Sequence, residues 1–391
     1  MNADISRNDF VDALTLSLDF LELGNRNTVT NHNKRVAYIA LRIAYALSLS
    51  EDDMFDLYAY AVLHDNGIAH SSYQTDLADC SKVGAHCLRG EENLKHFPFL
   101  VKRENILKYH HENFDGSGHF GLKGDEIPLF SQITHMADMT EVMYNRGESR
   151  ALIISATKEQ SGAAFTPELA EVVLTLLRNE SFWLSLNDLF ISKELRLYMP
   201  DREMILDWDG VTEISRVMSK IIDMKSPFTA RHSKGLAEKA ATMADFYKWD
   251  EIKKTKFIIA ALLHDTGKLI ISNDILDKDG TLTAEEYGAI KSHTFYTRRV
   301  LEAVRGFEEI TEWASNHHER LSGGGYPYGF DESRLGFEDR LMACLDIYQA
   351  LTEERPYRHP MEKEGVARIL YDMADTRAID KDIAKEVLET L

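Results

Sequence analysis

The sequence of 391 residues is poor in cysteine and in long apolar runs. Its three cysteines, Cys80, Cys87 and Cys344, cannot all pair, which argues against the disulfide framework of a secreted domain. The start, MNADISRNDFVDAL, has no basic segment followed by an apolar one, so no signal peptide is expected. The longest apolar run, FIIAALL, is far shorter than the ~20 residues of a membrane helix. We therefore expect a cytoplasmic protein.

Positive charge is also scarce, because 45 Lys and Arg residues stand against 64 Asp and Glu residues, a formal net charge of −19. Such a surface repels duplex DNA and anionic lipid unless basic side chains cluster locally. Neither duplex nucleic acid nor a membrane is therefore expected as a partner, whereas a homo-oligomer stays open. The apolar share of 44% is ordinary for a globular chain, and the length suggests two or three domains.

What the sequence does have is a repeat in its histidines. Two His-Asp dipeptides, at 64–65 and 264–265, lie in similar flanks, AVLHDNG and ALLHDTG, and each is followed by a His-His pair. The recurring side chains of the first copy are His32, His64, Asp65, His86, His110, His111 and Asp138. The matching side chains of the second copy are His232, His264, Asp265, His293, His317, His318 and Asp346. This register indicates two tandem domains, expected at residues 1–197 and 205–391.

Both copies are expected to be helical. NHNKRVAYIALRIAYALSLS and RHSKGLAEKAATMADFYKWD place apolar or small residues at i, i+3, i+4 and i+7, which is typical of one buried helical face. TAEEYGAIKSHTFYTRRVLEAV starts with a Thr cap and a Glu soon after it. No stretch alternates apolar and polar residues long enough to demand a strand. The sequence therefore predicts an all-α fold of two tandem helical domains, joined around residues 197–208.

The residue types of the repeat point to metal. Imidazole and carboxylate groups together suit Zn, Mn, Fe or Ni, and five histidines with two aspartates exceed the needs of one tetrahedral zinc. Two ions that share an aspartate explain the number better, and such a pair can clamp a phosphate for in-line displacement. A single histidine on an apolar helix is more often core than ligand, but the duplicated register argues against that here. The unmatched histidines, expected to be ordinary, are His70, His96, His119, His135 and His359.

Three motifs of the second copy resemble the signatures of HD-GYP domains, the bacterial cyclic-dinucleotide phosphodiesterases of the HD superfamily. They are HDTGK (264–268), HHERLSGGGYP (317–327) and DIYQALTEERPYR (346–358). The resemblance implies an all-helical, metal-dependent hydrolase of 3′–5′ phosphodiester bonds, with the seven residues of the second copy as metal ligands. Trimetal members carry a Glu where this chain has Phe228, so two divalent transition ions, Fe, Mn or Ni, are expected.

The resemblance also implies roles around the metals. Asp265 is expected to orient the attacking water and Lys268 to contact the scissile phosphate, which makes these two the catalytic residues. The glycines before the Tyr-Pro dipeptide let the loop approach a ligand and a ring stack on a base. The expected substrate contacts are Tyr326, Pro327, Arg320 and Arg355. One departure from the family is Ser322, which replaces an Asp of the loop motif and is expected to alter its hydrogen bonds.

The first copy departs further from the family. Ile68 replaces the lysine, and His119–Phe120 replace Tyr-Pro, which is expected to remove the turn that positions the loop. This copy is therefore expected to be a regulatory domain that hydrolyses nothing but can hold metal. Tandem chains with one degraded copy resemble bacterial 3′3′-cyclic GMP-AMP phosphodiesterases. That dinucleotide is thus the expected substrate and cyclic di-GMP the alternative. An HD-type hydrolase of other nucleotides, a non-catalytic sensor, or an inert first copy are the other hypotheses.

Overall fold

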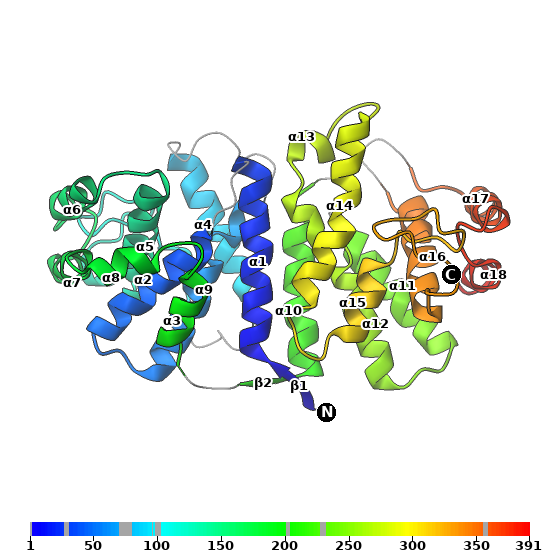
Figure 1. Cartoon of the computed structure of the whole chain (residues 1–391), viewed down its shortest axis with the longest axis horizontal. Helices are drawn as coiled ribbons and strands as arrows, with labels where there is room; N and C mark the ends of the chain where they lie inside the picture. The colour runs from blue at the N-terminus through cyan, green and yellow to red at the C-terminus, as the bar shows by residue number, and fades with distance from the viewer. Residues whose placement is uncertain are drawn as a thin grey trace. The chain divides into compact units, whose positions relative to one another are not determined.

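The computed structural model describes the chain except for residues 1, 27–30, 70–79, 96, 98–102, 201–203, 227–231 and 355–358, and the side chains of 2–4, 21–26, 69 and 80–82. Within the described residues almost all of the regular secondary structure is helical (Figure 1). Its only strands there are β1 (Asn2–Ser6) and β2 (Ile205–Asp207), which pair antiparallel. The predicted all-α class is confirmed.

Packing divides the chain into two compact units. The C-terminal unit consists of Met1–Arg26, Ala69–Ser71 and Met204–Leu391, and the N-terminal unit of Asn27–Ile68 and Ser72–Glu203. The repeat in the sequence had grouped residues 1–26 with the first copy. In the structure this segment instead packs with the second copy, because its apolar side chains find their partners there.

In the N-terminal unit, helix α2 forms the centre. It packs on α3, α5 and α9, and its residues 36–41 are fully buried. Side-chain caps start the surrounding helices: Ser50 accepts a hydrogen bond from the backbone N–H of Asp53, and Thr166 caps a helix that begins with Pro167. The described elements are α2 (His32–Ala46), α3 (Glu51–Leu63), η1 (Asn66–Ala69), α4 (Cys80–Leu94), η3 (Gly124–Glu126), α5 (Leu129–Asn145), α6 (Arg150–Glu159), α7 (Pro167–Leu177), α8 (Glu180–Ser185) and α9 (Ile191–Tyr198).

The C-terminal unit repeats this plan. Helix α11 packs on α12 and α16, and α14 packs on η4. The predicted helix start at Thr283 is confirmed, because Thr283 and Glu286 form a capping box at α14. The elements after the join are α10 (Trp208–Asp223), α11 (His232–Phe246), α12 (Glu251–Leu263), η4 (Thr266–Ile270), α13 (Asn273–Leu276), α14 (Ala284–Leu301), α15 (Glu308–Ser315), α16 (Phe337–Thr352), α17 (Lys363–Asp375) and α18 (Lys381–Thr390).

Helix α1 (Arg7–Arg26) completes the C-terminal unit from the other end of the sequence. It packs on η4 and α14. Near its start, the Phe10 ring meets the Phe307 ring edge-on at 5.7 Å, and Asp9 forms an ion pair with Arg305 at 2.8 Å. Farther along, the Phe20 ring lies 5.1 Å from the ring of Tyr296. The N-terminal segment is therefore fastened along its length to the unit that carries the second histidine set.

Candidate metal centres

The same turn brings the His-Asp dipeptide into place in both units. Helix α12 ends at Leu263, the dipeptide His264–Asp265 follows, and η4 begins directly after it at Thr266. A Cβ atom on Gly267 would lie 2.0 Å from the carbonyl oxygen of His293, and one on Gly67 would lie 2.2 Å from that of His86. Only glycine therefore allows the turn to press against the helix that carries the next histidine. This contact explains the glycine of HDNG and HDTG.

In the C-terminal unit three histidines are oriented by backbone carbonyls. The Nδ1 atoms of His264, His293 and His317 lie 2.8, 2.7 and 2.7 Å from carbonyl oxygens three residues earlier. Because a carbonyl only accepts, each Nδ1 carries the proton and each Nε2 presents a lone pair. The Nε2 atoms of His293 and His317 are 3.3 Å apart. The lone pairs thus converge, as they must to hold a cation.

The predicted ligands of the second copy all meet at this place, which we call the C-terminal centre. Three groups have ligand atoms within 4.8 Å of one another. They are His293 with His317 and His318; His232 with His264 and Asp346; and His264 with Asp265 and His317. The first two groups resemble two ion sites, and Asp265 lies between them, 3.1 Å from His264 Nε2 and 3.4 Å from His293 Nε2.

The electrostatics of the C-terminal centre fit a metal. Burial lowers the pKa of His293 to about 3 and that of His318 to about 4, so both rings are neutral, as metal ligands require. Oδ1 of Asp265 is buried and accepts no hydrogen bond from any described residue. A buried carboxylate oxygen without a donor is costly unless a cation lies beside it. The donor set therefore fits divalent transition ions.

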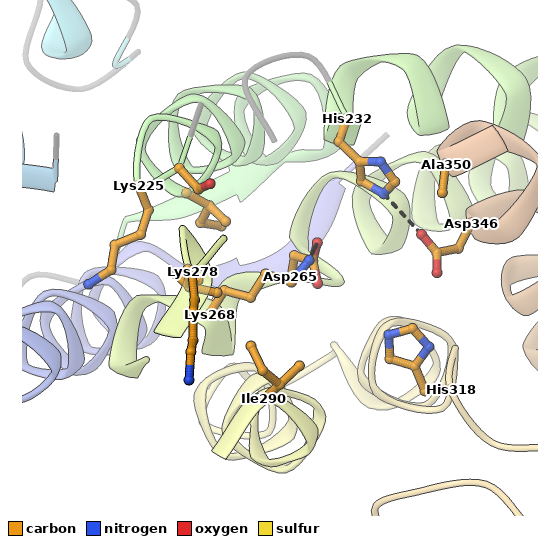
Figure 2. A pocket seen from close by; sticks show the side chains of 12 residues that line it. Lys225, His232, Asp265, Lys268, Lys278, Ile290, His318, Asp346 and Ala350 are labelled. Atoms are coloured by element: carbon orange, nitrogen blue, oxygen red, sulfur yellow. Dashed lines mark hydrogen bonds and ion pairs between the residues drawn. The ribbon is translucent and has the colours of Figure 1, made fainter. Parts of the chain in front are cut away.

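His232 is held differently from the other ligands. Its Nε2 lies 2.9 Å from Asp346 Oδ1 (Figure 2), and its Nδ1 lies 3.0 Å from Glu353 Oε2. Burial lowers the pKa of this imidazole, but the hydrogen bonds with the two carboxylates outweigh burial and raise it to about 10. Glu353 is thus the carboxylate that orients a ligand imidazole. The sequence did not reveal it, since nothing at the matching distance in the first copy repeats it.

A cavity of about 420 Å³ opens beside the C-terminal centre. His232, Asp265, His318 and Asp346 line it together with three lysines, Lys225, Lys268 and Lys278 (Figure 2). Nζ of Lys268 donates to Asp265 Oδ2 at 2.6 Å. Lys225 donates to the carbonyl of Leu269, and burial lowers its pKa to about 8, while Lys278 pairs with Glu286 at 2.7 Å. Lys225 and Lys278 were missed because neither belongs to a repeated motif.

The four expected substrate contacts are spread unevenly. The half-buried Tyr326 lies beside the centre, its ring 4.9 Å from that of His318, and burial raises its pKa. Pro327 follows it through a cis peptide bond and is half-buried too, whereas Arg320 is exposed. Arg355 lies outside the described residues, as does Phe228. The backbone N–H of Ser322 donates to the carbonyl of Arg377. The loop is therefore held by a backbone hydrogen bond at the residue that departs from the family.

The loop after the His-His pair is held by a glutamate in both units. Glu319 accepts the backbone N–H groups of Tyr328 and Phe330 at 2.8 and 3.0 Å. In the first copy Glu112 accepts those of Phe120 and Leu122 at 2.7 and 2.8 Å. The carboxylate of the HHE motif thus anchors both loops, but in the first copy its hydrogen bonds fall one position earlier, because Phe120 has an N–H where Pro327 has none. The prediction that His119–Phe120 removes the turn of the second copy stays a prediction.

The predicted ligands of the first copy meet as well, in what we call the N-terminal centre. His86, His110 and His111 form one group, together with Cys87, and His32, His64 and Asp138 form a second. The shortest separations are 3.4 Å, between Nε2 of His86 and Nε2 of His110 and between Nε2 of His32 and Nε2 of His64. The side chain of Asp65 lies 3.8 Å from His86 and 3.6 Å from His64. The repeated ligand side chains are therefore arranged in a similar way in the two centres.

Comparison with known proteins agrees with this duplication. The HD domain family matches residues 22–153 and 216–383. The chain is 30% identical over 369 residues to 3′3′-cGAMP-specific phosphodiesterase 1 of Vibrio cholerae, covering 90% of this chain and 85% of that protein. It is 29% identical over 425 residues to 3′3′-cGAMP-specific phosphodiesterase 3 of the same organism, covering 95% and 91%.

A solved structure shares the whole architecture. A crystal structure of the Vibrio cholerae cyclic GMP-AMP specific phosphodiesterase V-cGAP3 superposes with a TM-score of 0.69 at 25% identity, covering 99% of this chain and 98% of that chain. The chain therefore belongs to the HD domain family, whose members are metal-dependent phosphohydrolases, and the resemblance found in the motifs is confirmed. Among the described residues, no helix has the length and apolar character needed to cross a membrane.

Proposed function

We propose that this chain hydrolyses a 3′–5′ phosphodiester bond of a cyclic dinucleotide, with 3′3′-cyclic GMP-AMP preferred and cyclic di-GMP as the alternative, and releases a linear dinucleotide. The observation that carries the proposal is the cavity of the C-terminal unit, which joins a seven-ligand metal centre to Lys268. The similarity to two 3′3′-cGAMP-specific phosphodiesterases over nearly the whole chain supports the substrate.

Two divalent transition ions, Fe, Mn or Ni, fit the donors of the C-terminal centre. One would be held by His232, His264 and Asp346, the other by His293, His317 and His318, with Asp265 shared between them. When bound, such ions polarise a phosphate and activate water. The carboxylates of Asp346 and Glu353, on either side of the His232 ring, fix its orientation for this task.

Asp265 and Lys268 are the catalytic residues of the proposal. Asp265 reaches the ligands on both sides of it and thereby fixes where the attacking water lies. Lys268 is 22% exposed on its side chain and points into the same cavity from one turn later (Figure 2). Its ammonium group donates to Asp265 in the structure, and in the complex it would donate to a non-bridging phosphate oxygen, where negative charge grows.

The cavity and the loop after His318 offer contacts to a dinucleotide. The second phosphate of the dinucleotide needs a cation in this acidic chain, and Lys278, which lines the same cavity as Lys268, is proposed to supply it. The ring of Tyr326 is available to stack on a base, and Pro327, Arg320 and Arg355 remain proposed contacts. The first copy, which has Ile68 in place of the lysine, is proposed to be regulatory and to hold metal without hydrolysing substrate.

The test is a comparison of kcat/KM for the two dinucleotides, with guanosine tetraphosphate as the third substrate, on the full chain loaded in turn with Fe²⁺, Mn²⁺ and Ni²⁺. We expect turnover of 3′3′-cyclic GMP-AMP to exceed that of cyclic di-GMP. A tenfold preference for cyclic di-GMP would reverse the ranking. Hydrolysis of neither dinucleotide by metal-loaded protein would end the proposal.

A further inference from the structure

The N-terminal centre contains a cysteine that has no counterpart at the C-terminal centre. Cys87 follows His86 on α4, and its ligand atom lies within 4.8 Å of those of His86, His110 and His111. At the matching position on α14 the chain has Thr294, whose hydroxyl donates to the carbonyl of Lys291 within its own helix. The first copy thus has one more donor beside its metal-capable histidines.

The position of the thiol suits an ion shared with these rings. Cys87 is 1% exposed, and its Sγ lies 3.7 Å from Nε2 of His86. The His110 ring also lies beside Sγ, but its Nδ1 faces the carbonyl of Leu107, so Nε2 is its ligand atom. Two imidazole ligands of one tetrahedral zinc are about 3.3 Å apart, and a thiolate and an imidazole about 3.6 Å, from the usual bond lengths. The measured separations, 3.4 Å between the His86 and His110 Nε2 atoms and 3.7 Å to Sγ, lie close to both.

We propose that the N-terminal centre is a closed metal site in which Cys87 joins His86, His110 and His111 around one zinc-like divalent ion. Four protein donors fill a tetrahedral shell, which is the mark of a structural site, whereas a catalytic site keeps one position open for water or substrate. The thiolate selects a softer ion than the His-Asp set of the C-terminal centre does. The inference rests on the proposed role of the first copy as a metal-binding, non-hydrolysing domain. It adds which kind of ion the domain binds and why the domain does not hydrolyse substrate.

This site accounts for the pattern of change in the first copy. His86, His110 and His111 persist because an ion there holds α4 to the loop of the His-His pair, and the free energy of ion binding stabilises this contact. The lysine at position 68 is lost because no phosphate comes to a filled coordination shell. Retained ligands and lost catalysis then have one cause.

The test is the spectrum of the full chain stripped of metal and titrated with Co²⁺. We expect a sulfur-to-cobalt charge-transfer band in the near ultraviolet, which only a thiolate ligand produces. Cys87→Thr places in the first copy the residue that the second copy has at this position, and it should remove the band. It should also weaken Zn²⁺ binding, measured against a competing chelator, by more than the 10- to 100-fold typical of losing a hydrogen-bond partner of a ligand.

Two further variants sharpen the result. Cys344→Ala removes a buried thiol of the C-terminal unit and should leave the band intact. Thr294→Cys should add a second band and lower turnover, because it fills the open position of the C-terminal centre. No band in the wild-type protein, or an equal band in Cys87→Thr, would overturn the inference. A band in protein that hydrolyses no dinucleotide would instead refute the proposed function and leave the site standing.

Discussion

The two metal centres share their ligands and differ in the side chains around them. Lys268 faces the C-terminal centre where the N-terminal centre has Ile68. On the roles proposed above, the difference teaches that a duplicated site can lose its reaction while it keeps its ligands. The ligands would hold helices together through an ion, whereas the lysine, which pairs with Asp265 in the structure, would serve the phosphate.

A second difference shows how each centre supports its first histidine. In the N-terminal centre Glu141 contacts His32 Nδ1 and accepts a hydrogen bond from Nε of Arg35 at 2.8 Å. In the C-terminal centre the matching positions are Gln349 and Gly235, packed so closely that a Cβ on the glycine would lie 2.4 Å from the amide. There the carboxylate comes from Glu353 instead. The ion pair of Arg35 and Glu141 in the first copy thus corresponds in the second copy to Gly235 packed against the side-chain amide of Gln349.

The largest expected effect separates the two centres outright. His264→Ala combined with Asp265→Ala should reduce hydrolysis to the background rate, because two ligands of the C-terminal centre are gone. The matched change in the first copy, His64→Ala with Asp65→Ala, should leave measurable hydrolysis. Both are measured as kcat on the metal-loaded full chain, with helix content followed by circular dichroism. An equal loss of kcat in the two variants would mean that hydrolysis depends on both centres alike.

The next effect concerns the lysine. Lys268→Ala should lower kcat by about 10² to 10³, the scale for losing one preorganised donor to developing charge. Metal content, measured by elemental analysis, should not change. The control is Ile68→Ala at the matching position of the first copy, which should leave kcat as it is. Loss of metal along with activity would make Lys268 a structural partner of Asp265.

Stability should reveal the ion pair of the first copy. Glu141 and Arg35 are buried, and Glu141→Gln leaves the guanidinium with only the exposed Asp188 as a charge partner. We expect the N-terminal unit to lose about 3 kcal/mol of unfolding free energy, the scale for breaking a buried pair. Arg35→Gly together with Glu141→Gln copies the arrangement of the C-terminal unit and should lose less than the two single changes together. Urea unfolding measures all three, and strict additivity would contradict the coupling.

The smallest effect is a pH dependence confined to one unit. Burial raises the pKa of Asp339 on α16 to about 6, whereas the first copy has Ser131 at this position. A raised folded-state pKa stabilises the fold fully below the unfolded value of 3.8, and this contribution is lost as the pH rises through about 6. In metal-free protein, the stability of the wild type relative to Asp339→Ser should therefore fall by about 2 kcal/mol between pH 4 and 7. A difference that stays constant or grows with pH would contradict the shift.

The sequence predicted the parts of this molecule that recur within it. The His-Asp register brought all fourteen repeated side chains to two centres, and helical periodicity with the Thr283 cap predicted the helices around them. The supports of the centres were not predictable in this way. Glu353 and Lys225 belong to no repeat, and their roles arise from long-range packing. Cys87 was weighed only as a disulfide partner, although the step from His293–Thr294 to His86–Cys87 was visible as a signal.

The packing of α1 in the C-terminal unit has a consequence for the order in which the units fold during synthesis. Asp9 and Arg305, which form an ion pair, are 296 positions apart in the chain, and Phe10 and Phe307 are separated by a similar distance in sequence. Helix α1 is therefore translated well before η4 and α14, the elements on which it packs. Folding of a nascent chain ordinarily proceeds from the N-terminus, and contacts of long sequence separation form late. The unit that holds Lys268 can thus close only after the intervening N-terminal unit has been translated, although its helix α1 precedes that unit in the sequence.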